Sequence, residues 1–394
     1  MAATDPARAG GRVTDTQPLW PAALADERLL PWFEQVRSAV PGGQLYDAHT
    51  HIGFNDPDGF KLAPDQLVAA LERAHARGVV FPMHEPDGYT PANDAALELA
   101  AASDGRLVAF ARLNPADAPL AELVRALDAG ARGIKLHPRA EQFELADPRL
   151  EGVFALADER RLPVLVHAGR GIPALGRHAV ELCERHPRLR IILAHAAISD
   201  LSWIWAAADE LPNLFFDTAW WSAADLLALF TLVPPGQIVW ASDAPYGSPL
   251  IGACIGLRCA QQAGISGDML RAVAGGTIAA LVAGEDPPDL GPPVGTDRID
   301  GDVLLARVET FLITALGRML VGADGHEALQ LARLACDVER GTRAAATCAS
   351  VLSLLDIYDE VRAEHPDANP RVGLAFVIIA AIVARTPDVP LPTT

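Results

Sequence analysis

The stretch Tyr46–Gly53, with the sequence YDAHTHIG, decides the fold because of where its two histidines stand. It overlaps the short extended run Gln44–Asp47, and in a β-strand residues two positions apart point to the same side. We therefore expect His49 and His51 to converge. Two imidazoles on one side of a strand end supply part of the ligand set of a borderline metal such as Zn²⁺. With 11 histidines in 394 residues such a pair can arise by chance, so its meaning depends on the rest of the chain.

Short apolar runs, several of them β-branched, recur after this stretch with helical patterns between them. Eight runs are found, counting the first: Gln44–Asp47, Gly78–Phe81, Arg106–Ala111, Gly133–Leu136, Pro163–Val166, Arg190–Leu193, Asn213–Phe216 and Gln237–Trp240. Apolar strands that alternate with helices indicate a parallel sheet, and eight such units close a (β/α)₈ TIM barrel. An open doubly wound sheet is the alternative. It often has a glycine-rich loop after the first strand, where this chain has His49-Thr50-His51.

The chain divides into four parts. Residues 1–23 are expected to be a loose leader, 24–284 the barrel, 285–296 a Pro-rich linker and 297–394 a helical domain. The barrel should begin with a helix over Pro31–Val40, with the proline in its first turn, and close with a helix over Leu270–Ala283. The helical domain is an all-α appendage whose four predicted helices are Asp302–Leu320, His326–Glu339, Thr342–Val361 and Arg371–Arg385.

Composition narrows the class of protein. A net charge of −18 without a basic cluster argues against nucleic-acid binding. The five cysteines show no C-x-x-C spacing, which argues against a disulfide framework or a structural zinc knot. The N-terminus has no apolar signal segment, and the longest apolar stretch, Gly373–Ala384, is too short for a membrane span of about 20 residues. We therefore expect a cytoplasmic protein that does not bind membranes.

Residues with metal-binding and acid–base chemistry stand where the predicted strands end. The first run is followed by His49 and His51. The other residues are Lys135 and His137 at the end of the fourth run, His167 after the fifth, His195 after the sixth and Asp243 after the eighth. Active sites of such barrels lie at the C-terminal ends of the strands. Solvated histidines would have no reason to follow this placement, so the pattern predicts one shared site.

These segments together resemble the amidohydrolase superfamily, in particular its amidohydrolase-related branch, which includes metal-dependent hydrolases and aminocarboxymuconate semialdehyde decarboxylase-like enzymes. The similar segments span residues 24–284 and are Asp47–His51, Gly133–Pro138, Val164–Gly169, Ile192–His195 and Ser242–Gly247. The sequence departs from the family at Gly275-Gly276-Thr277, where a Gly-Asn pair is usual, and the helices from about 297 onward lie outside the resemblance.

The resemblance implies a barrel that holds a divalent metal, usually zinc, through His49, His51, His167 and Asp243. His195 would be a further ligand or an unligated catalytic group. Three histidines and a carboxylate leave a water position on five-coordinate zinc, and a water bound there has its pKa lowered towards about 7. Asp243 could accept the proton of that water as a general base, and the fifth residue of the set, His195, could polarise a substrate carbonyl.

Lys135 leaves the number of metal ions open. It could become carbamylated and bridge two ions, which requires a lowered lysine pKa, or it could orient the ligands by hydrogen bonding. We expect one ion rather than two. His137, Arg170 and Tyr246 are candidate substrate contacts, with a surface-loop position as the plain alternative; a guanidinium can bind a substrate carboxylate through two hydrogen bonds.

The resulting hypothesis is a metal-dependent hydrolase that acts on a small amide, lactone or ester. A non-oxidative decarboxylase is the alternative among enzymes, favoured if Arg170 holds a substrate carboxylate. A catalytically inactive barrel that serves as a scaffold is the alternative outside enzymes. The apolar segment Leu374–Val383 needs cover, either from the other C-terminal helices or from a second copy in a homodimer.

Overall fold

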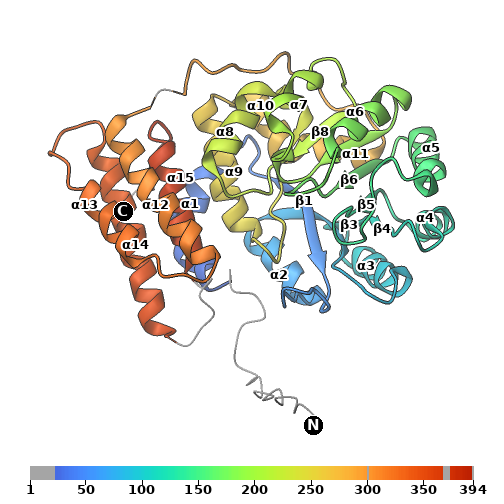
Figure 1. The fold of residues 1–394 in the computed structure, drawn as a ribbon, viewed down its shortest axis with the longest axis horizontal. Helices are drawn as coiled ribbons and strands as arrows, with labels where there is room; N and C mark the ends of the chain where they lie inside the picture. The colour runs from blue at the N-terminus through green and yellow to red at the C-terminus, as the bar shows by residue number, and fades with distance from the viewer. Residues whose placement is uncertain (1–22, 300, 367–372, 393–394) are drawn as a thin grey trace, which may run out of the picture.

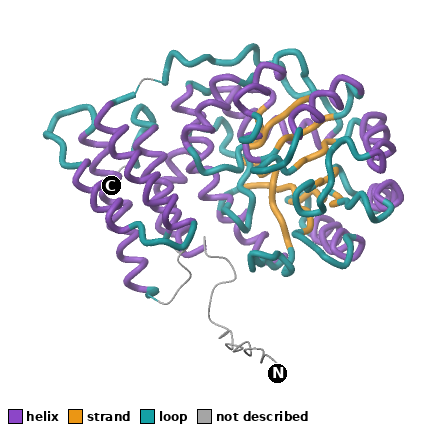
Figure 2. The backbone as a smooth tube through the Cα atoms, in the orientation of Figure 1, coloured by secondary structure: helices purple, strands orange, loops and turns teal. Residues whose placement is uncertain are grey.

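A ring of parallel strands forms the centre of the molecule, with helices outside it (Figures 1 and 2). The computed structural model describes residues 23–299, 301–366 and 373–392, so nearly all of the predicted leader lies outside the described residues. The strands are β1 (Leu45–Ile52), β2 (Ala76–Pro82), β3 (Leu107–Ala109), β4 (Ala111–Arg112), β5 (Ile134–Leu136), β6 (Pro163–Val166), β7 (Arg190–Leu193), β8 (Leu214–Asp217) and β9 (Ile238–Val239). Each of the eight predicted runs overlaps strand structure, and β3 and β4 together form the third barrel strand.

Backbone hydrogen bonds close the ring. Strands β1 to β3 form one parallel sheet and β4 to β9 another. Phe110 N donates to Val80 O over 3.0 Å where these sheets meet. At the other junction Ala48 N donates to Trp240 O over 3.0 Å, and His51 N donates to Ala244 O over 2.8 Å. The predicted (β/α)₈ TIM barrel is therefore confirmed, and the open-sheet alternative is wrong.

The barrel helices follow the predicted alternation. They are α2 (Pro64–Arg73), α3 (Thr90–Ala102), α4 (Pro119–Asp128), α5 (Glu151–Arg160), α6 (Leu175–Arg185), α7 (Leu201–Ala208), α8 (Ala223–Leu232), α9 (Pro249–Ala263), α10 (Gly267–Arg271) and α11 (Thr277–Ala283). The predicted closing helix is divided at Ala272–Gly276, a π-helical turn in which Gly275 approaches Tyr46 closely enough that a Cβ would lie 2.9 Å from the tyrosine Cβ. Only glycine fits there without movement of β1.

The first helix begins earlier than the sequence predicted. Helix α1 spans Ala23–Arg37, so Pro31 lies inside it and not in its first turn. Leu29 and Phe33 are fully buried in the main hydrophobic core, which also contains residues of α2, α9 and the appendage. Burial of this face outweighs the loss of one helical hydrogen bond at the proline.

The C-terminal appendage is entirely helical in the described ranges, as predicted, with α12 (Val303–Leu320), α13 (His326–Ala335), α14 (Ala345–Glu364) and α15 (Leu374–Arg385). It lies against α1 and α9, and α15 also contacts α8 (Figure 1). Phe376 and Ile379 of α15 are fully buried among helices of the same chain, so this apolar helix has its cover without a second copy. None of the described helices is long and apolar enough to cross a membrane.

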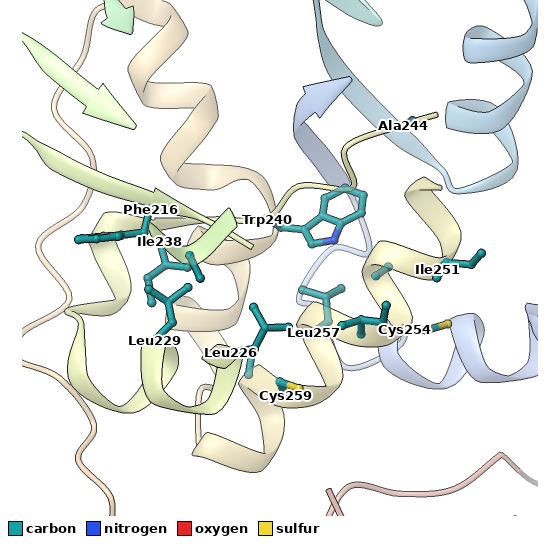
Figure 3. Close-up of a cluster of buried hydrophobic side chains, with 14 of the residues drawn as sticks. Phe216, Leu226, Leu229, Ile238, Trp240, Ala244, Ile251, Cys254, Leu257 and Cys259 are labelled. Atoms are coloured by element: carbon teal, nitrogen blue, oxygen red, sulfur yellow. The ribbon is translucent and has the colours of Figure 1, made fainter. Parts of the chain in front are cut away.

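Trp240, directly after β9, is surrounded by side chains of α8 and α9 (Figure 3). It is fully buried with Leu226, Leu257 and Cys259. This packing holds in place the segment that directly precedes Asp243. The interior of the barrel below the site is filled by a separate cluster that includes Phe81, Phe110, Phe215 and Val239, so the barrel is a packed core and not a pore.

Gly133→Ala should destabilise the protein because a Cβ at this position would lie 2.6 Å from Cε1 of the fully buried Phe110 ring. Overpacking of this kind costs about 1–3 kcal/mol in the free energy of unfolding. Gly317→Ala is the matched control, since an added Cβ in α12 meets no atom within 4 Å, and it should stabilise by about 0.5–1 kcal/mol. Urea unfolding of both variants measures this; equal effects would contradict the described packing.

Asp26 of α1 should make stability depend on pH. Burial raises the pKa of this carboxyl to about 6, above its ordinary value of 3.8. The folded protein then binds a proton that the unfolded chain has lost, so between about pH 4 and pH 6 Asp26 destabilises the fold increasingly as the pH rises. We expect Asp26→Asn to gain up to about 3 kcal/mol over the wild type across this range, with a constant difference above it. A difference independent of pH, measured by urea unfolding, would contradict this.

Candidate active site

Asp243 and two histidines of β1 meet at the C-terminal mouth of the barrel. The Nε2 atoms of His49 and His51 both lie 3.1 Å from Asp243 Oδ1. Strand β1 continues to Ile52, beyond the predicted run, so both histidines lie within the strand and not after it. A register shift between Asp47 and Thr50 interrupts the pairing of β1 with β2 at this point. The expected convergence of His49 and His51 is present, on the half-buried carboxylate of Asp243.

The backbone at this site is strained. Asp243 has a φ of 58° and His195 a φ of 58°, a left-handed conformation that costs about 1–3 kcal/mol at residues other than glycine. Hydrogen bonds on both sides hold Asp243 in place: its amide donates to His49 O over 2.9 Å, and its carbonyl accepts from Tyr246 N over 2.8 Å. Such strain is common where side chains are held in a functional arrangement.

Hydrogen bonds assign the protonated nitrogen of each imidazole on β1. His49 Nδ1 donates to Asp217 Oδ2 over 2.7 Å, and His51 Nδ1 lies 3.4 Å from Pro82 O, which only accepts. Each Nε2 therefore presents a lone pair, and both lone pairs face an oxygen of Asp243. Lone pairs directed at a carboxylate repel one another unless a cation lies between them. This donor set fits a divalent metal ion.

Asp217 was missed by the sequence analysis, although it directly follows the seventh predicted run, Asn213–Phe216, and the strand-end rule could have found it. It is fully buried. Oδ2 accepts from His49, while Oδ1 accepts from the backbone amides of His195 over 2.7 Å and Ala219 over 3.0 Å. One carboxylate thus orients a ring on β1 and the strained segment after β7. Burial raises the pKa of Asp217 to about 7, and these donors oppose that rise.

His195 and His167 form a second pair beside Asp243. His195 Nδ1 donates to Ala219 O over 2.8 Å, so its Nε2 accepts from His167 Nδ1 over 2.9 Å. His167 Nε2 is then a buried nitrogen without a hydrogen-bond partner. Such an unsatisfied lone pair is costly in a metal-free site and is suited to a metal ion.

The two pairs are not equally close to Asp243. Within the described ranges, His49, His195 and Asp243 form the group whose ligand atoms all lie within 4.8 Å of one another and could hold a metal ion. His51 is outside that group although it reaches Asp243 Oδ1. His167 contacts His195 and stacks on His137, with ring centroids 3.9 Å apart. The structure therefore places His195 nearer to Asp243 than the predicted ligand His167.

Lys135 lies inside the cluster. It is fully buried, its Nζ is 3.1 Å from His49 Nε2, and it lies 4.8 Å from the centroid of the Phe81 ring. Burial lowers the pKa of Lys135 to about 7, although Asp243 and Asp217 oppose the shift. The lowered lysine pKa that carbamylation requires is therefore present. Burial likewise raises the pKa of Asp243 to about 6.

The candidate substrate contacts lie around the mouth. Arg170 is exposed, with its guanidinium 5.6 Å from the Trp220 ring centroid. Tyr246 is 40% exposed and donates to Asp56 Oδ1 over 2.5 Å. His137 stacks on His167. A cavity of about 640 Å³ lies between the loops that follow β5 and β6; its lining includes Arg139, Phe143 and Ile172.

A buried ion pair near the site, between Arg112 and Glu141, was also missed. Arg112, at the end of β4, donates to Glu141 Oε1 over 2.7 Å and to Pro82 O over 3.2 Å. Pro82 O is also the partner of His51. The only sequence signal was the position of Arg112 at the end of the third run, one residue beyond the predicted limit.

Fold and site together define a TIM-barrel protein with a cluster of cation ligands at the C-terminal mouth. The amidohydrolase family model, Amidohydro_2, matches residues 46–283, more than half of the chain, and the chain belongs to this family. The resemblance found in the sequence is thereby confirmed. None of the curated proteins matches the chain.

Solved structures are similar to part of this chain, at low sequence identity. An uncharacterized TIM-barrel protein from Bordetella bronchiseptica is 17% identical, with a TM-score of 0.51 over 61% of this chain and 99% of its own. A candidate amidohydrolase from Staphylococcus aureus is 16% identical, with a TM-score of 0.50 and the same coverage. A 5-carboxyvanillate decarboxylase from Sphingomonas paucimobilis is 18% identical, with a TM-score of 0.48 over 61% of this chain and 99% of its own. At these identities the first two likenesses show the fold alone.

Asp217→Asn should weaken divalent-metal binding about 10–100-fold, because the amide can no longer accept from His49, His195 and Ala219 together. The dissociation constant for Zn²⁺, from competition with a chromophoric chelator, measures this. Asp200→Asn is the control: Asp200 also accepts a backbone amide at a barrel loop, that of Gly176, and does not contact the cluster. Equal effects of the two substitutions would show that Asp217 does not orient metal ligands.

Proposed function

We propose that this protein is a metal-dependent hydrolase that acts on a small amide, lactone or ester. The proposal depends on the convergence of two imidazole nitrogens and a carboxylate oxygen at the barrel mouth. His49 Nε2 and His51 Nε2 each lie 3.1 Å from Asp243 Oδ1. Membership of the amidohydrolase family supports it.

We propose that His49, His51, His167 and Asp243 hold one Zn²⁺ ion, with His195 as a further ligand or a catalytic group. A zinc ion in such a site supplies a water of lowered pKa and polarises a carbonyl oxygen. Asp243 would accept the water proton, which suits a carboxyl whose pKa burial raises to about 6. His195 lies on the other side of Asp243, with its Nδ1 4.0 Å from Oδ2. To hold a developing oxyanion, His195 would need a proton on Nε2, the nitrogen that accepts from His167 in the structure.

Lys135 bears on the number of ions. Its Nζ lies 3.1 Å from His49 Nε2, among the proposed ligand atoms, and this position supports an orienting role. Its lowered pKa would also permit carbamylation and a second ion. We propose one ion, with metal counting under bicarbonate as the discriminating measurement.

Decarboxylation of a small carboxylate is the second candidate, favoured by one observation: the exposed guanidinium of Arg170 lies at the mouth beside Trp220 and can bind a carboxylate. A catalytically inactive scaffold would be expected to have lost a ligand, and His49, His51, His167 and Asp243 are all retained. A small-molecule substrate, a homodimer through the C-terminal helices and a cytoplasmic location stand as predictions.

The test is turnover of a panel of small lactones, esters, amides and aromatic acids by zinc-loaded protein in H₂¹⁸O. Hydrolysis places one ¹⁸O atom in the acid product, whereas decarboxylation releases CO₂ and leaves an organic product that carries no ¹⁸O. Asp243→Asn should lower kcat/KM at least about 100-fold because it removes the general base. Asp268→Asn, the same change at an exposed position of α10, should leave it unchanged. Full activity of Asp243→Asn would overturn the assignment.

A further inference from the structure

The loop that carries Asp243 ends in a buried hydrogen bond that nothing in the proposed chemistry uses. Residues 240–248 run from β9 to α9. The first half of the loop is held by β1, through Ala48, His49 and His51. The second half ends at Ser248, which is fully buried, and its Oγ accepts from Ile251 N over 3.0 Å as the N-cap of α9.

The same hydroxyl donates to Asp26 Oδ1 over 2.8 Å. Asp26 belongs to α1, is 1% exposed, and has Arg73 NH1 3.4 Å from its other oxygen. Burying a carboxylate is costly, and a serine hydroxyl together with a long contact to arginine compensates this cost only in part. A buried carboxylate that is expensive for the fold and reaches the end of the Asp243 loop points to a role in positioning.

Between its two ends the loop is tightly packed. Tyr246 N and Gly247 N both donate to Asp243 O, over 2.8 and 3.2 Å. A Cβ at residue 247 would lie 2.4 Å from Ser242 O, so the backbone passes over itself at this point. A displacement of Ser248 is therefore transmitted to Asp243 through a few rigid residues. The left-handed backbone of Asp243 makes it sensitive to such a displacement.

The appendage forms hydrogen bonds and ion pairs with both helices that meet at the Ser248–Asp26 contact, α9 and α1. Arg258 of α9 is 1% exposed and donates to Thr386 Oγ1 over 2.7 Å and to the carbonyls of Thr386, Val389 and Pro390 over 2.9–3.0 Å. On α1, Arg28 binds Glu360 and Glu364 of α14. Helices α1 and α9 lie between the barrel and the appendage (Figure 1).

We propose that Asp26 and Ser248 are positioning residues for Asp243. The appendage binds both α1 and α9, and through these two residues it helps to hold the loop of Asp243 in place. The role of Asp243 as a ligand rests on the proposed function; the positioning of its loop does not. The appendage is thus part of the machinery that shapes the site, although it lies outside the region that matches the family.

The experiment compares two pairs of variants. Ser248→Ala removes the donor, and Asp26→Leu removes the acceptor. Ser248→Thr and Asp26→Asn keep a hydroxyl and an acceptor oxygen, so they should restore the wild-type behaviour. Gln237→Ala is the stability control. Gln237 directly precedes β9, at the end of that strand away from Asp243, and its side chain donates to the carbonyls of Ala208, Leu211 and Leu214.

Two readouts separate positioning from mere stability. The first is amide hydrogen exchange of Tyr246 and Gly247 in metal-free protein, and the second is the dissociation constant for Zn²⁺ from chelator competition. Ser248→Ala and Asp26→Leu should speed exchange and weaken zinc binding, each about 10-fold. The two conservative variants and Gln237→Ala should stay within about 3-fold of the wild type, as expected when the ligand positions are kept.

Arg258→Met tests the contribution of the appendage and should shift both readouts in the same direction by a smaller factor. Wild-type exchange and zinc affinity in Ser248→Ala, together with lowered stability like that of Gln237→Ala, would overturn the positioning role. Unchanged readouts in Arg258→Met would overturn the part assigned to the appendage. A wild-type protein that binds no zinc would overturn the proposed function instead, and exchange in the metal-free protein would still decide whether the loop is positioned.

Discussion

The closure of the barrel between β1 and the segment after β9 is the constraint on which the site depends. Asp47 of β1 is fully buried, and its Oδ1 accepts from His49 N over 3.1 Å and from Ser242 N over 3.0 Å. One carboxylate thus joins the two segments that carry the histidine pair and Asp243. Asp243 N also donates to His49 O, so backbone hydrogen bonds hold the backbone of Asp243 against the strand that carries the two imidazoles. The contacts that close the barrel are therefore the same contacts that bring the residues of the site together.

The site concentrates ionisable groups where water is excluded. Burial raises the pKa of Asp47 and of Asp217 to about 7 and lowers that of Lys135 to about 7, so each charge there is disfavoured by its surroundings. Burial also lowers the pKa of His49 and His51 well below the ordinary value. Neutral imidazoles with free lone pairs are the form that binds a metal ion. A divalent cation would compensate the buried carboxylates, which ties the electrostatics of the site to its proposed cofactor.

Much of the fold could be predicted because local sequence carries the signal. The eight apolar runs and the helices between them follow from periodicity, and the strand-end rule then places His49, His51, Lys135, His195 and Asp243 together. Helix α9 could not be recognised from an amphipathic pattern, because it is buried on nearly every side. The proline inside α1 was misplaced because its tertiary packing cannot be read from the helix sequence. The contacts of Asp217, Arg112 and Asp26 join residues far apart in the chain, and one sequence does not encode such pairs visibly.

The central claim is that His49, His51, His167 and Asp243, with His195 beside them, form a metal site at the mouth of the barrel. The most direct test is the number of metal ions per chain, by elemental analysis of protein purified without chelator and again after zinc loading in bicarbonate. One equivalent in the wild type, lost in a variant with both His49 and His51 replaced by alanine, is the predicted result. Two equivalents would assign a second ion to Lys135. No bound metal after loading would contradict the claim and favour the inactive scaffold.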